Sequence, residues 1–423
     1  MSMVKQALHY VQARQDEQLA QLKGLLAIPS ISAQPAHKAD CLWAAQWLAD
    51  HLLAIGVHRA ELLPTGGQPV VYAEWLAQPD APTVLVYGHY DVQPPDPLDE
   101  WENDPFQAEV RDGKIYARGA SDDKGQLFAL IKAMEGYLQT AGRLPVNVKI
   151  MLEGEEEIGS PSLSAFVCRE QGRLAANVAL IADSYILSPH QPSLPYSVRG
   201  LVYMQVEVRA AQRDMHSGTY GGAVHNPIHV LAEIIARLRD TEGRIAIPGF
   251  YDTVVPLTPE EREELAQVPF DIEAFRANAG LLSTWGEKGY SVQEQTTARP
   301  SLDCNGIVGG YTEPGIKTVL PAKASAKISM RTVANQTPEQ IARLFSDYIY
   351  QIAPPTVSVS VEQLAGAYPA LVDRRHPAMV AAAEAYEAGF GRRPVFTREG
   401  GTLPIVAEMQ RVLRLTPVLM GFG

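Results

Sequence analysis

Acidic side chains and one histidine follow three short apolar segments of this sequence, and residues of these types could together hold a metal ion. The segments and the residues that follow them are Thr83–Tyr87 before Gly88-His89-Tyr90-Asp91, Val146–Leu152 before Glu153-Gly154-Glu155-Glu156-Glu157, and Val178–Ala182 before Asp183. A further pair, Asp122-Asp123, lies in a glycine-flanked turn ahead of a helical segment. Several carboxylates in one place repel one another unless a cation lies among them. Nitrogen and carboxylate ligands suit zinc, with manganese or cobalt as possible substitutes.

The segments that carry these residues are predicted to be buried strands. Their apolar character is continuous rather than alternating, which is typical of strands covered on both faces in a mainly parallel sheet. Val70–Trp75 is a fourth such strand, Gln126–Leu138 is predicted as a helical crossover, and most of residues 1–56 are predicted to be helical. In open α/β sheets the ligand site lies beyond the carboxyl ends of the strands. The predicted strands would therefore bring the histidine and the carboxylates to one edge.

A second, smaller domain is predicted in the middle of the chain. Leu201–Arg209 and Ala322–Thr332 alternate apolar and polar residues, as expected of strands with one face exposed to water. A helix with a capping box is predicted at Pro338–Ile352, and a long acidic, proline-containing stretch lies at about Pro248–Pro300. The expected fold class is therefore α/β, a mainly parallel sheet domain with an inserted α+β, ferredoxin-like domain. The predicted boundaries are 1–197 and 366–423 for the first domain and 198–365 for the second.

The composition excludes several classes of protein. The chain has 36 Lys and Arg against 48 Asp and Glu, a formal net charge of −12. An acidic chain without a Lys/Arg-rich block is not expected to bind nucleic acid or an anionic membrane surface. No apolar run approaches the roughly 20 residues of a membrane-spanning helix. Three scattered cysteines make a disulfide framework unexpected, so the prediction is a soluble, cytoplasmic protein.

Each chemical pattern has a plainer explanation when it is taken alone. A pair such as His89 and Asp91 is more often a surface coincidence, and Glu155-Glu156-Glu157 is more often a solvated charge run. An acidic, solvated sheet edge would not explain why apolar strands lead into each cluster. The coincidence of these four placements, three after strands and one in the turn before a helix, therefore favours a functional site.

These residues belong to five ordered motifs that resemble the co-catalytic zinc peptidases of metallopeptidase family twenty, which includes carnosinases, bacterial dipeptidases, carboxypeptidase G and the aminoacylases. The motifs are GHYDVQP at 88–94, GASDDKG at 119–125, EGEEEIGS at 153–160, DMHSGTYGG at 214–222 and TREGGTLP at 397–404. The resemblance runs over nearly the whole chain. It looks closest to the carnosinase-type dipeptidase branch, and implies a zinc-peptidase catalytic domain with an inserted lid and dimerisation domain.

The resemblance implies two zinc ions per chain. His89 and Asp183 would hold one ion, Glu157 would hold the other, and Asp122 would bridge both. In this family the peptide bond between Asp122 and Asp123 is typically cis, an arrangement that is costly outside functional sites.

Two further residues of the same edge have implied catalytic roles. Asp91 would orient His89 by accepting the remaining N–H of its ring. Glu156, adjacent to a ligand but not itself one, would be the general base that takes a proton from water and passes it to the leaving amine.

The implied substrate contacts lie elsewhere in the sequence. His216 would reach the scissile carbonyl in the partner subunit of a homodimer and stabilise the oxyanion, although a loop histidine bonded to Asp214 is the plainer alternative. Arg331 would bind a substrate carboxylate, although a solvated cation on a strand is the plainer alternative. Thr402, in a glycine-rich turn, and Asn305 are further substrate-contact candidates.

The chain departs from the family pattern at one place. The family supplies one more metal-ligating histidine, shortly after the strand that is here Pro417–Met420, and no histidine follows His376. We therefore expect a truncated C-terminus and a second zinc site that lacks its last ligand.

The predicted function is hydrolysis of the peptide bond of dipeptides or short peptides through a water between the metal ions. An N-acyl-amino-acid deacylase or a carboxypeptidase would use the same metals and differ in the substrate pocket. An inactive, truncated homologue that serves as a binding or structural protein is the alternative outside the enzymes.

Overall fold

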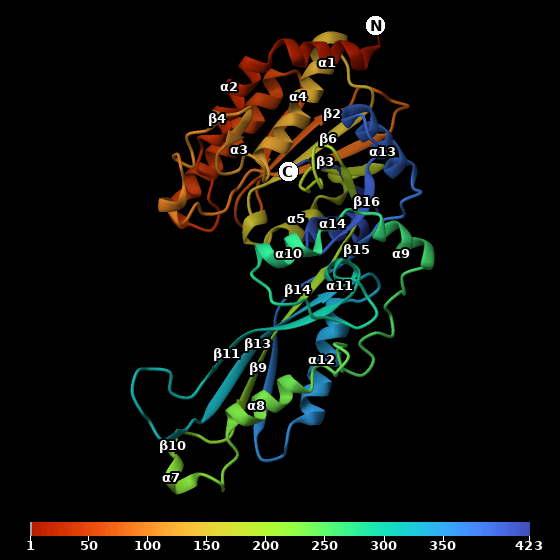
Figure 1. Ribbon diagram of the computed structural model, residues 1–423. Helices are drawn as coiled ribbons and strands as arrows, with labels where there is room; N and C mark the ends of the chain where they lie inside the picture. Colours follow the sequence, from red (N-terminus) through yellow and green to blue (C-terminus); the bar gives the residue numbers. More distant parts are fainter. Residues whose placement is uncertain (1) are drawn as a thin grey trace. The chain divides into compact units, whose positions relative to one another are not determined.

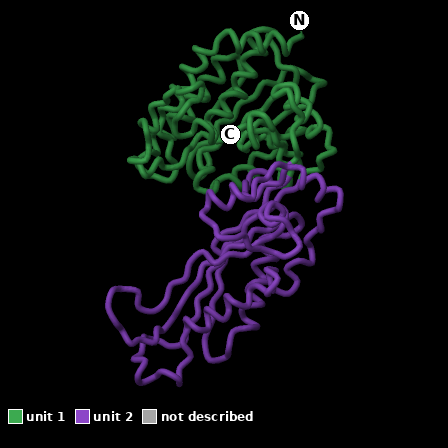
Figure 2. The backbone as a smooth tube through the Cα atoms, viewed as in Figure 1, with its two compact units in different colours: residues 1–196, 372–396, 408–423 green, residues 197–371, 397–407 purple. Residues whose placement is uncertain are grey.

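The computed structural model describes residues 2–423, which form two compact units (Figure 1, Figure 2). Unit 1 comprises residues 1–196, 372–396 and 408–423, and unit 2 comprises residues 197–371 and 397–407. The sequence placed 397–407 in the first domain, whereas the structure groups this segment with unit 2. The reason lies in polar contacts, because Arg199 donates to the carbonyl of Gly400 and Arg398 pairs with Glu261.

Unit 1 is built on a six-stranded sheet of order β1-β2-β6-β3-β7-β17. Its strands are β1 (Arg59–Leu63), β2 (Val70–Trp75), β3 (Thr83–His89), β6 (Asn147–Glu153), β7 (Val178–Ile181) and β17 (Thr416–Leu419). Strand β3 runs parallel to both β6 and β7, and β17 runs parallel to β7, whereas β1 and β2 are antiparallel additions. The sheet is thus mainly parallel, as predicted from its continuous apolar strands.

The register of the central strands aligns their carboxyl ends. His89 at the end of β3 lies opposite Glu153 at the end of β6, and Tyr87 lies opposite Ile181 at the end of β7. The residues that follow these three strands therefore begin at the same edge of the sheet.

Helices cover both faces of this sheet (Figure 1). The helices of unit 1 are α1 (Met3–Ala13), α2 (Gln15–Leu26), α3 (Lys38–Ala54), α4 (Lys124–Ala141), α5 (Leu163–Arg169), α6 (Gln171–Leu174) and α13 (Pro377–Phe390), and α14 (Pro404–Arg411) follows β16 (Val395–Glu399). Residues of α2, α3 and α4, such as Leu48 and Ile131, form one core with β2, β3 and β6. Residues of α13, such as Met379, form another with Val418 of β17. Both faces of the strands are buried, which explains their continuous apolar sequence.

A buried polar cluster joins α3 to α4. Lys132 donates hydrogen bonds to His51 Nε2 at 2.8 Å, to Gln21 at 2.5 Å and to Glu135 at 2.6 Å. The His51 ring stacks on Trp47 with 4.8 Å between ring centroids. Burial, together with the charge of Lys132, lowers the pKa of His51 from its ordinary 6.5 to about 4. The folded protein therefore holds this imidazole neutral, as an acceptor for Lys132.

We expect this cluster to make stability sensitive to acid. The pKa of His51 is lower in the folded than in the unfolded chain. The contribution of neutral His51 to the free energy of unfolding is therefore complete above pH 6.5 and is lost as the pH falls toward 4. The glutamine in His51→Gln keeps an acceptor for Lys132 and cannot be protonated. Between pH 7.5 and pH 5 the free energy of unfolding of this variant should therefore fall by about 1 kcal/mol less than that of the unaltered protein. Thermal unfolding at the two pH values measures the difference. The exposed His58→Gln is the control, and equal acid sensitivity of both variants would contradict the expectation.

Unit 2 contains a four-stranded antiparallel sheet of order β11-β13-β9-β14. Its strands are β9 (Gly200–Arg209), β11 (Ser301–Gly309), β13 (Lys323–Thr332) and β14 (Ser358–Ala367). In β9 the alternate residues Val202, Met204, Val206 and Val208 are buried, as the alternating sequence predicts. Helices α8 (Pro227–Ala236) and α12 (Pro338–Ile352) pack on this apolar face, and the other face carries the polar side chains.

The acidic stretch at about 248–300 also folds into regular structure. It contains the short helices α9 (Pro259–Ala266), α10 (Ile272–Asn278) and α11 (Val292–Thr297), none of which was predicted from the sequence. Thr258, Asp271 and Ser291 each cap one of these helices by accepting backbone N–H bonds.

Short elements complete the structure. They are β4 (Glu109–Arg111), β5 (Lys114–Tyr116), β8 (Ser193–Val198), β10 (Met215–His216), α7 (Ser217–Tyr220), β12 (Val319–Leu320), β15 (Ala370–Leu371) and the 3₁₀ turns η1 (Pro35–His37), η2 (Leu98–Glu100) and η3 (Glu156–Ile158). Within residues 2–423, none of the helices has both the length and the apolar character needed to cross a bilayer.

Candidate metal centre

His89 is the buried centre of the sheet edge in unit 1. Its side chain is fully buried at the end of β3, where its backbone N–H donates to Asp123 at 3.1 Å. Its ring nitrogens have different partners: Nδ1 lies 3.0 Å from the backbone carbonyl of Asp91, and Nε2 lies 2.9 Å from Asp122 Oδ1. A carbonyl can only accept, so Nδ1 carries the proton and Nε2 faces the carboxylates.

Asp122 and Asp183 complete a cluster around His89 Nε2. Asp183, which follows β7, places Oδ2 at 3.8 Å from this nitrogen. One potential ligand atom from each of the three residues lies within 4.8 Å of the others. These three residues come from the ends of two neighbouring strands and from the turn before α4, so the sheet register brings them together.

Asp91 connects His89 to the acidic segment after β6. Its carboxylate lies 3.4 Å from His89 Nδ1, farther than its own backbone carbonyl. Its two carboxylate oxygens accept the backbone N–H groups of Glu156 at 3.2 Å and Glu157 at 3.1 Å. Asp91 therefore holds the turn η3 and the histidine in one arrangement, and its bonds with the backbone of η3 were not predicted from the sequence.

The two glutamates of η3 have different surroundings. The carboxylate of Glu157 accepts hydrogen bonds from the backbone N–H of Gln93 at 3.2 Å and from its side-chain amide at 2.8 Å. Glu157 lies outside the group whose ligand atoms are within 4.8 Å of one another. For the carboxyl group of Glu156, the structure of residues 2–423 shows no hydrogen-bond donor. This carboxyl group is thus free to act on a ligand.

Burial is the main influence on the acidic groups of the cluster. Burial raises the pKa of Glu156 to about 8, and burial likewise raises the pKa of Glu157 and of Asp183. The hydrogen bond to His89 lowers the pKa of Asp122. Burial disfavours the His89 imidazolium, yet the hydrogen bonds to Asp122 and Asp91 outweigh it and raise the pKa of His89 well above 6.5. The carboxyl groups around His89 therefore differ in their affinity for protons.

The arrangement fits a bound metal ion. One imidazole nitrogen and two carboxylates converge, and this donor set suits zinc or manganese. The buried Asp123 Oδ1 lacks a hydrogen-bond partner among the described residues, and burial holds the pKa of this side chain well above its ordinary value. A cation among these groups would favour their charged forms and offset their mutual repulsion.

The turn that presents Asp122 is closely packed. A Cβ on Gly125 would lie 1.9 Å from the carbonyl oxygen of Ala120, so only glycine fits there. The peptide bond between Asp122 and Asp123 is cis, as expected from the resemblance. Lys124 is fully buried and donates to the carbonyls of Ile28 at 2.7 Å and Leu25 at 3.3 Å.

Two of the predicted substrate contacts lie together in unit 2. Arg331, on β13, donates a hydrogen bond to the hydroxyl of Thr402 at 2.6 Å. No ion pair of Arg331 with a carboxylate occurs in the described part of the chain, which leaves guanidinium donors for a ligand.

The other two predicted contacts are exposed. His216 lies on β10, where Nδ1 accepts from the backbone N–H of Gly218 at 3.1 Å and Nε2 lies 3.3 Å from the hydroxyl of Thr318. Among residues 2–423 no hydrogen bond joins His216 to Asp214, whose carboxylate accepts from the backbone N–H of Ala322 at 2.8 Å. Asn305 lies at a register shift in β11, between Cys304 and Gly306.

Three polar residues near these sites were not predicted from the sequence. Gln93 holds Glu157, Thr318 contacts His216, and Arg199 donates to the carbonyl of Gly400 at 2.9 Å. Each contact joins segments distant in the sequence. Gln93 lies within the GHYDVQP motif, which is the one signal that could have drawn attention to it.

Comparisons with known proteins identify the family of the chain and several of its relatives. A family model described as peptidase family M20/M25/M40 matches residues 85–423. The chain is 33% identical over 440 residues to the Beta-Ala-His dipeptidase of Homo sapiens, an alignment that covers 100% of this chain and 87% of that protein.

Solved structures extend the similarity to the fold. The dipeptidase Dug1p from Saccharomyces cerevisiae matches with a TM-score of 0.80 and 28% identity, covering 100% of this chain and 92% of that one. The metallo-carboxypeptidase Sso-CP2 from Sulfolobus solfataricus matches with a TM-score of 0.83 and 32% identity, covering 95% and 90%.

Proposed function

The chain belongs to peptidase family M20/M25/M40, and from this premise we propose that it is a zinc-dependent dipeptidase. The observation that carries the proposal is the convergence of His89 Nε2, Asp122 and Asp183 within 4.8 Å, next to Glu156. A nitrogen and two carboxylates form a zinc ligand set, and a free carboxyl group beside them is what hydrolysis requires.

The proposed ligands divide into two sets. His89 and Asp183 would hold one zinc ion, Glu157 would hold a second, and Asp122 would be shared between them. Asp91 is a positioning residue, since its contacts fix the orientation of the His89 ring and of the backbone at Glu157. Manganese or cobalt could replace zinc in such a site.

Glu156 is the proposed general base. When bound, the metal ions supply the positive charge that lowers the pKa of water and stabilises the developing oxyanion. Glu156 accepts a proton from the attacking water and returns it to the leaving amine as the C–N bond breaks. Burial raises the pKa of Glu156, which favours retention of the accepted proton until the amine leaves.

The proposed substrate contacts come from unit 2. Arg331 binds the carboxylate of the dipeptide, and Thr402 accepts from Arg331 and so fixes its guanidinium. His216 stabilises the oxyanion from the partner subunit of a homodimer, and Asn305 contacts the substrate. A cytoplasmic location belongs to the proposal and is supported by the free thiols of Cys41, Cys168 and Cys304.

Metal content and hydrolysis measured on the same preparation test the proposal. We expect at least one zinc ion per chain and turnover of dipeptides such as β-Ala-His and Cys-Gly, the substrates named for two relatives. Removal of the metal with a chelator should lower activity more than about a hundredfold, and added Zn²⁺ should restore it.

Other results would overturn the proposal. Hydrolysis that survives complete metal removal would exclude the metal mechanism. Faster turnover of N-acetyl-amino acids than of dipeptides would identify a deacylase, and cleavage restricted to longer peptides would identify a carboxypeptidase. A zinc-loaded protein that hydrolyses none of these substrates would be an inactive binding homologue.

A further inference from the structure

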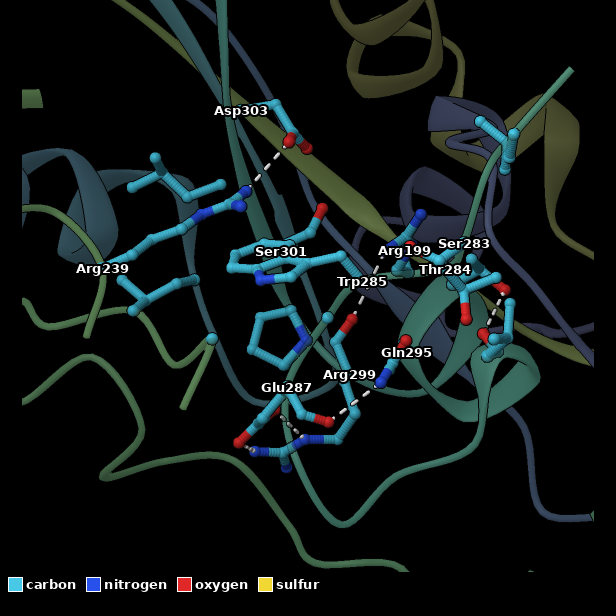
Figure 3. A pocket seen from close by; sticks show the side chains of 18 of the residues that line it. Arg199, Arg239, Ser283, Thr284, Trp285, Glu287, Gln295, Arg299, Ser301 and Asp303 are labelled. Atoms are coloured by element: carbon cyan, nitrogen blue, oxygen red, sulfur yellow. Dashed lines mark hydrogen bonds and ion pairs between the residues drawn. The ribbon is translucent and has the colours of Figure 1, made fainter. Parts of the chain in front are cut away.

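Unit 2 contains a cavity of about 470 Å³ for which no role has been assigned so far (Figure 3). It is lined by β11, by the segment between α10 and α11, and by residues of α11. Its lining includes Arg199, Arg239, Ser283, Trp285, Arg299 and Asp303. Cationic, aromatic and small polar groups therefore meet in one hollow.

Two of the three arginines in this cavity have carboxylate partners. Arg299 forms two hydrogen bonds of 2.8 Å with Glu287, and both side chains are buried. Arg239 pairs with Asp303 at 2.9 Å and lies over the ring of Trp285 (Figure 3). These two charges are compensated within the protein.

Arg199 has no such partner. Its guanidinium donates to the carbonyl oxygens of Gly400 at 2.9 Å and Arg299 at 3.4 Å, and no ion pair of Arg199 is present within residues 2–423. Burial, with the nearby charge of Arg331, lowers the pKa of Arg199 to about 10, against the opposing effect of the Asp303 carboxylate, which is itself paired with Arg239. A guanidinium has five N–H groups, so donors remain for a ligand. A desolvated cation without an anion is costly, and a bound anion would remove that cost.

Arg199 also borders the proposed carboxylate site. Its backbone N–H donates to Gly401 at 3.0 Å, and its side chain holds Gly400, so it anchors the turn that carries Thr402. Thr402 in turn bonds Arg331. A Cβ on Gly400 would lie 2.5 Å from the backbone oxygen of Thr296, a residue of the cavity wall. One turn thus separates the cavity from the guanidinium of Arg331.

Another part of the lining is apolar and exposed. The side chain of Trp285 is 65% exposed, and Phe275 and Leu281 also line the cavity. In the view of Figure 3 the Trp285 ring lies between Arg239 and Arg199. Apolar walls with one uncompensated cation suit a short aliphatic chain that ends in a negative charge.

We propose that this cavity is the specificity pocket for the C-terminal side chain of the dipeptide, and that Arg199 selects an acidic residue, glutamate above all, at that position. The inference rests on the proposed function, in which Arg331 holds the main-chain carboxylate of the same residue. Arg199 then binds the side-chain carboxylate, and Trp285 packs against its methylene groups.

Two matched substrates test the pocket. Ala-Glu and Ala-Gln differ by one charge at nearly equal shape, so the ratio of their kcat/KM values isolates recognition of that charge. We expect the ratio to favour Ala-Glu by about tenfold or more. A ratio of one or less would overturn the inference. Hydrolysis of Ala-Gln would still support the proposed function, so the two failures are distinguishable.

Exposed Ser283 offers variants that leave the turn at Thr402 intact. Ser283→Asp places a negative charge at the cavity and should lower the Ala-Glu to Ala-Gln ratio about two- to fivefold, while Ser283→Arg should raise it by a similar factor. The same substitutions at exposed Ser360 on β14, which does not line the cavity, are the matched controls. Equal effects at the two positions would mean that only the net charge of the protein matters. That result would contradict binding of the substrate side chain in this cavity.

A binding measurement separates recognition from catalysis. In the Glu156→Gln protein, Ala-Glu should bind more tightly than Ala-Gln and should change the fluorescence of Trp285, a change that Trp285→Phe should remove. Arg199→Lys, which keeps the charge but cannot make the paired contacts, should reduce the preference for Ala-Glu. Binding of both dipeptides with equal affinity would show that the cavity does not distinguish the C-terminal side chains of the two dipeptides.

Discussion

Glu156→Gln is expected to lower kcat by about 10²–10⁴-fold while zinc content stays unchanged. The amide has nearly the shape of the carboxylate but cannot take a proton from water. Glu156 holds its place through its backbone N–H, which donates to Asp91 at 3.2 Å, and its carboxyl group has no donor among residues 2–423. The substitution therefore removes one proton-transfer group and leaves the contacts of the turn intact. Steady-state kinetics and elemental analysis of the same sample measure both quantities.

The neighbouring Glu155 provides the control. Its carboxylate accepts a hydrogen bond from the backbone N–H of Gln68 at 3.1 Å, and a glutamine at this position keeps an oxygen that can accept the same bond. Glu155→Gln should change kcat only by a small factor. If Glu156→Gln retained activity like that of Glu155→Gln, the base would have to be another group.

Asp122→Asn is the second variant with a large expected effect. Asp122 Oδ1 lies 2.9 Å from His89 Nε2, and the hydrogen bond to His89 lowers the pKa of this carboxyl group, so it is charged at neutral pH. A bridging ligand contributes to both proposed metal ions, so loss of its charge should weaken zinc binding at least about a hundredfold. Zinc content after dialysis against a weak chelator measures the effect, and kcat/KM should fall with it.

An acidic residue outside the cluster is the control for this variant. Exposed Asp99→Asn removes the same charge from unit 1 and should leave zinc content and activity unchanged. Full zinc occupancy and full activity in Asp122→Asn would show that the ligand atoms come from other residues.

The sheet edge could be predicted because local sequence and topology agree there. Continuous apolar runs identify β3, β6 and β7 as buried strands, and parallel strands in register end at one edge. His89, Asp122 and Asp183 could therefore be expected to meet without knowledge of their distances. The bonds from the backbone N–H groups of Glu156 and Glu157 to Asp91 could not be expected, since they depend on the path of the backbone at η3, 65 residues away from Asp91.

The unpredicted elements lack a strong periodic pattern. In β11 only Leu302 is buried, and Asp303 and Cys304 are exposed before the register shift, so no alternation marks this edge strand. Helices α9 to α11 are six to eight residues long and are held by caps rather than by an apolar face. The cavity beside Arg199 depends on these same elements, which is why its existence could not be derived from the sequence.

The pairing of β17 with β7 has a consequence for synthesis of the chain on the ribosome. All residues of the cluster around His89 precede residue 184, whereas β17 follows β7 after 234 intervening residues. At about 5–20 residues per second, translation of that interval takes roughly 10–50 s. During this time the apolar strand β7 lacks its neighbour on one side and offers unpaired backbone groups to any passing strand. Nascent chains should therefore depend on chaperones until β17 emerges, even though the metal ligands are already available.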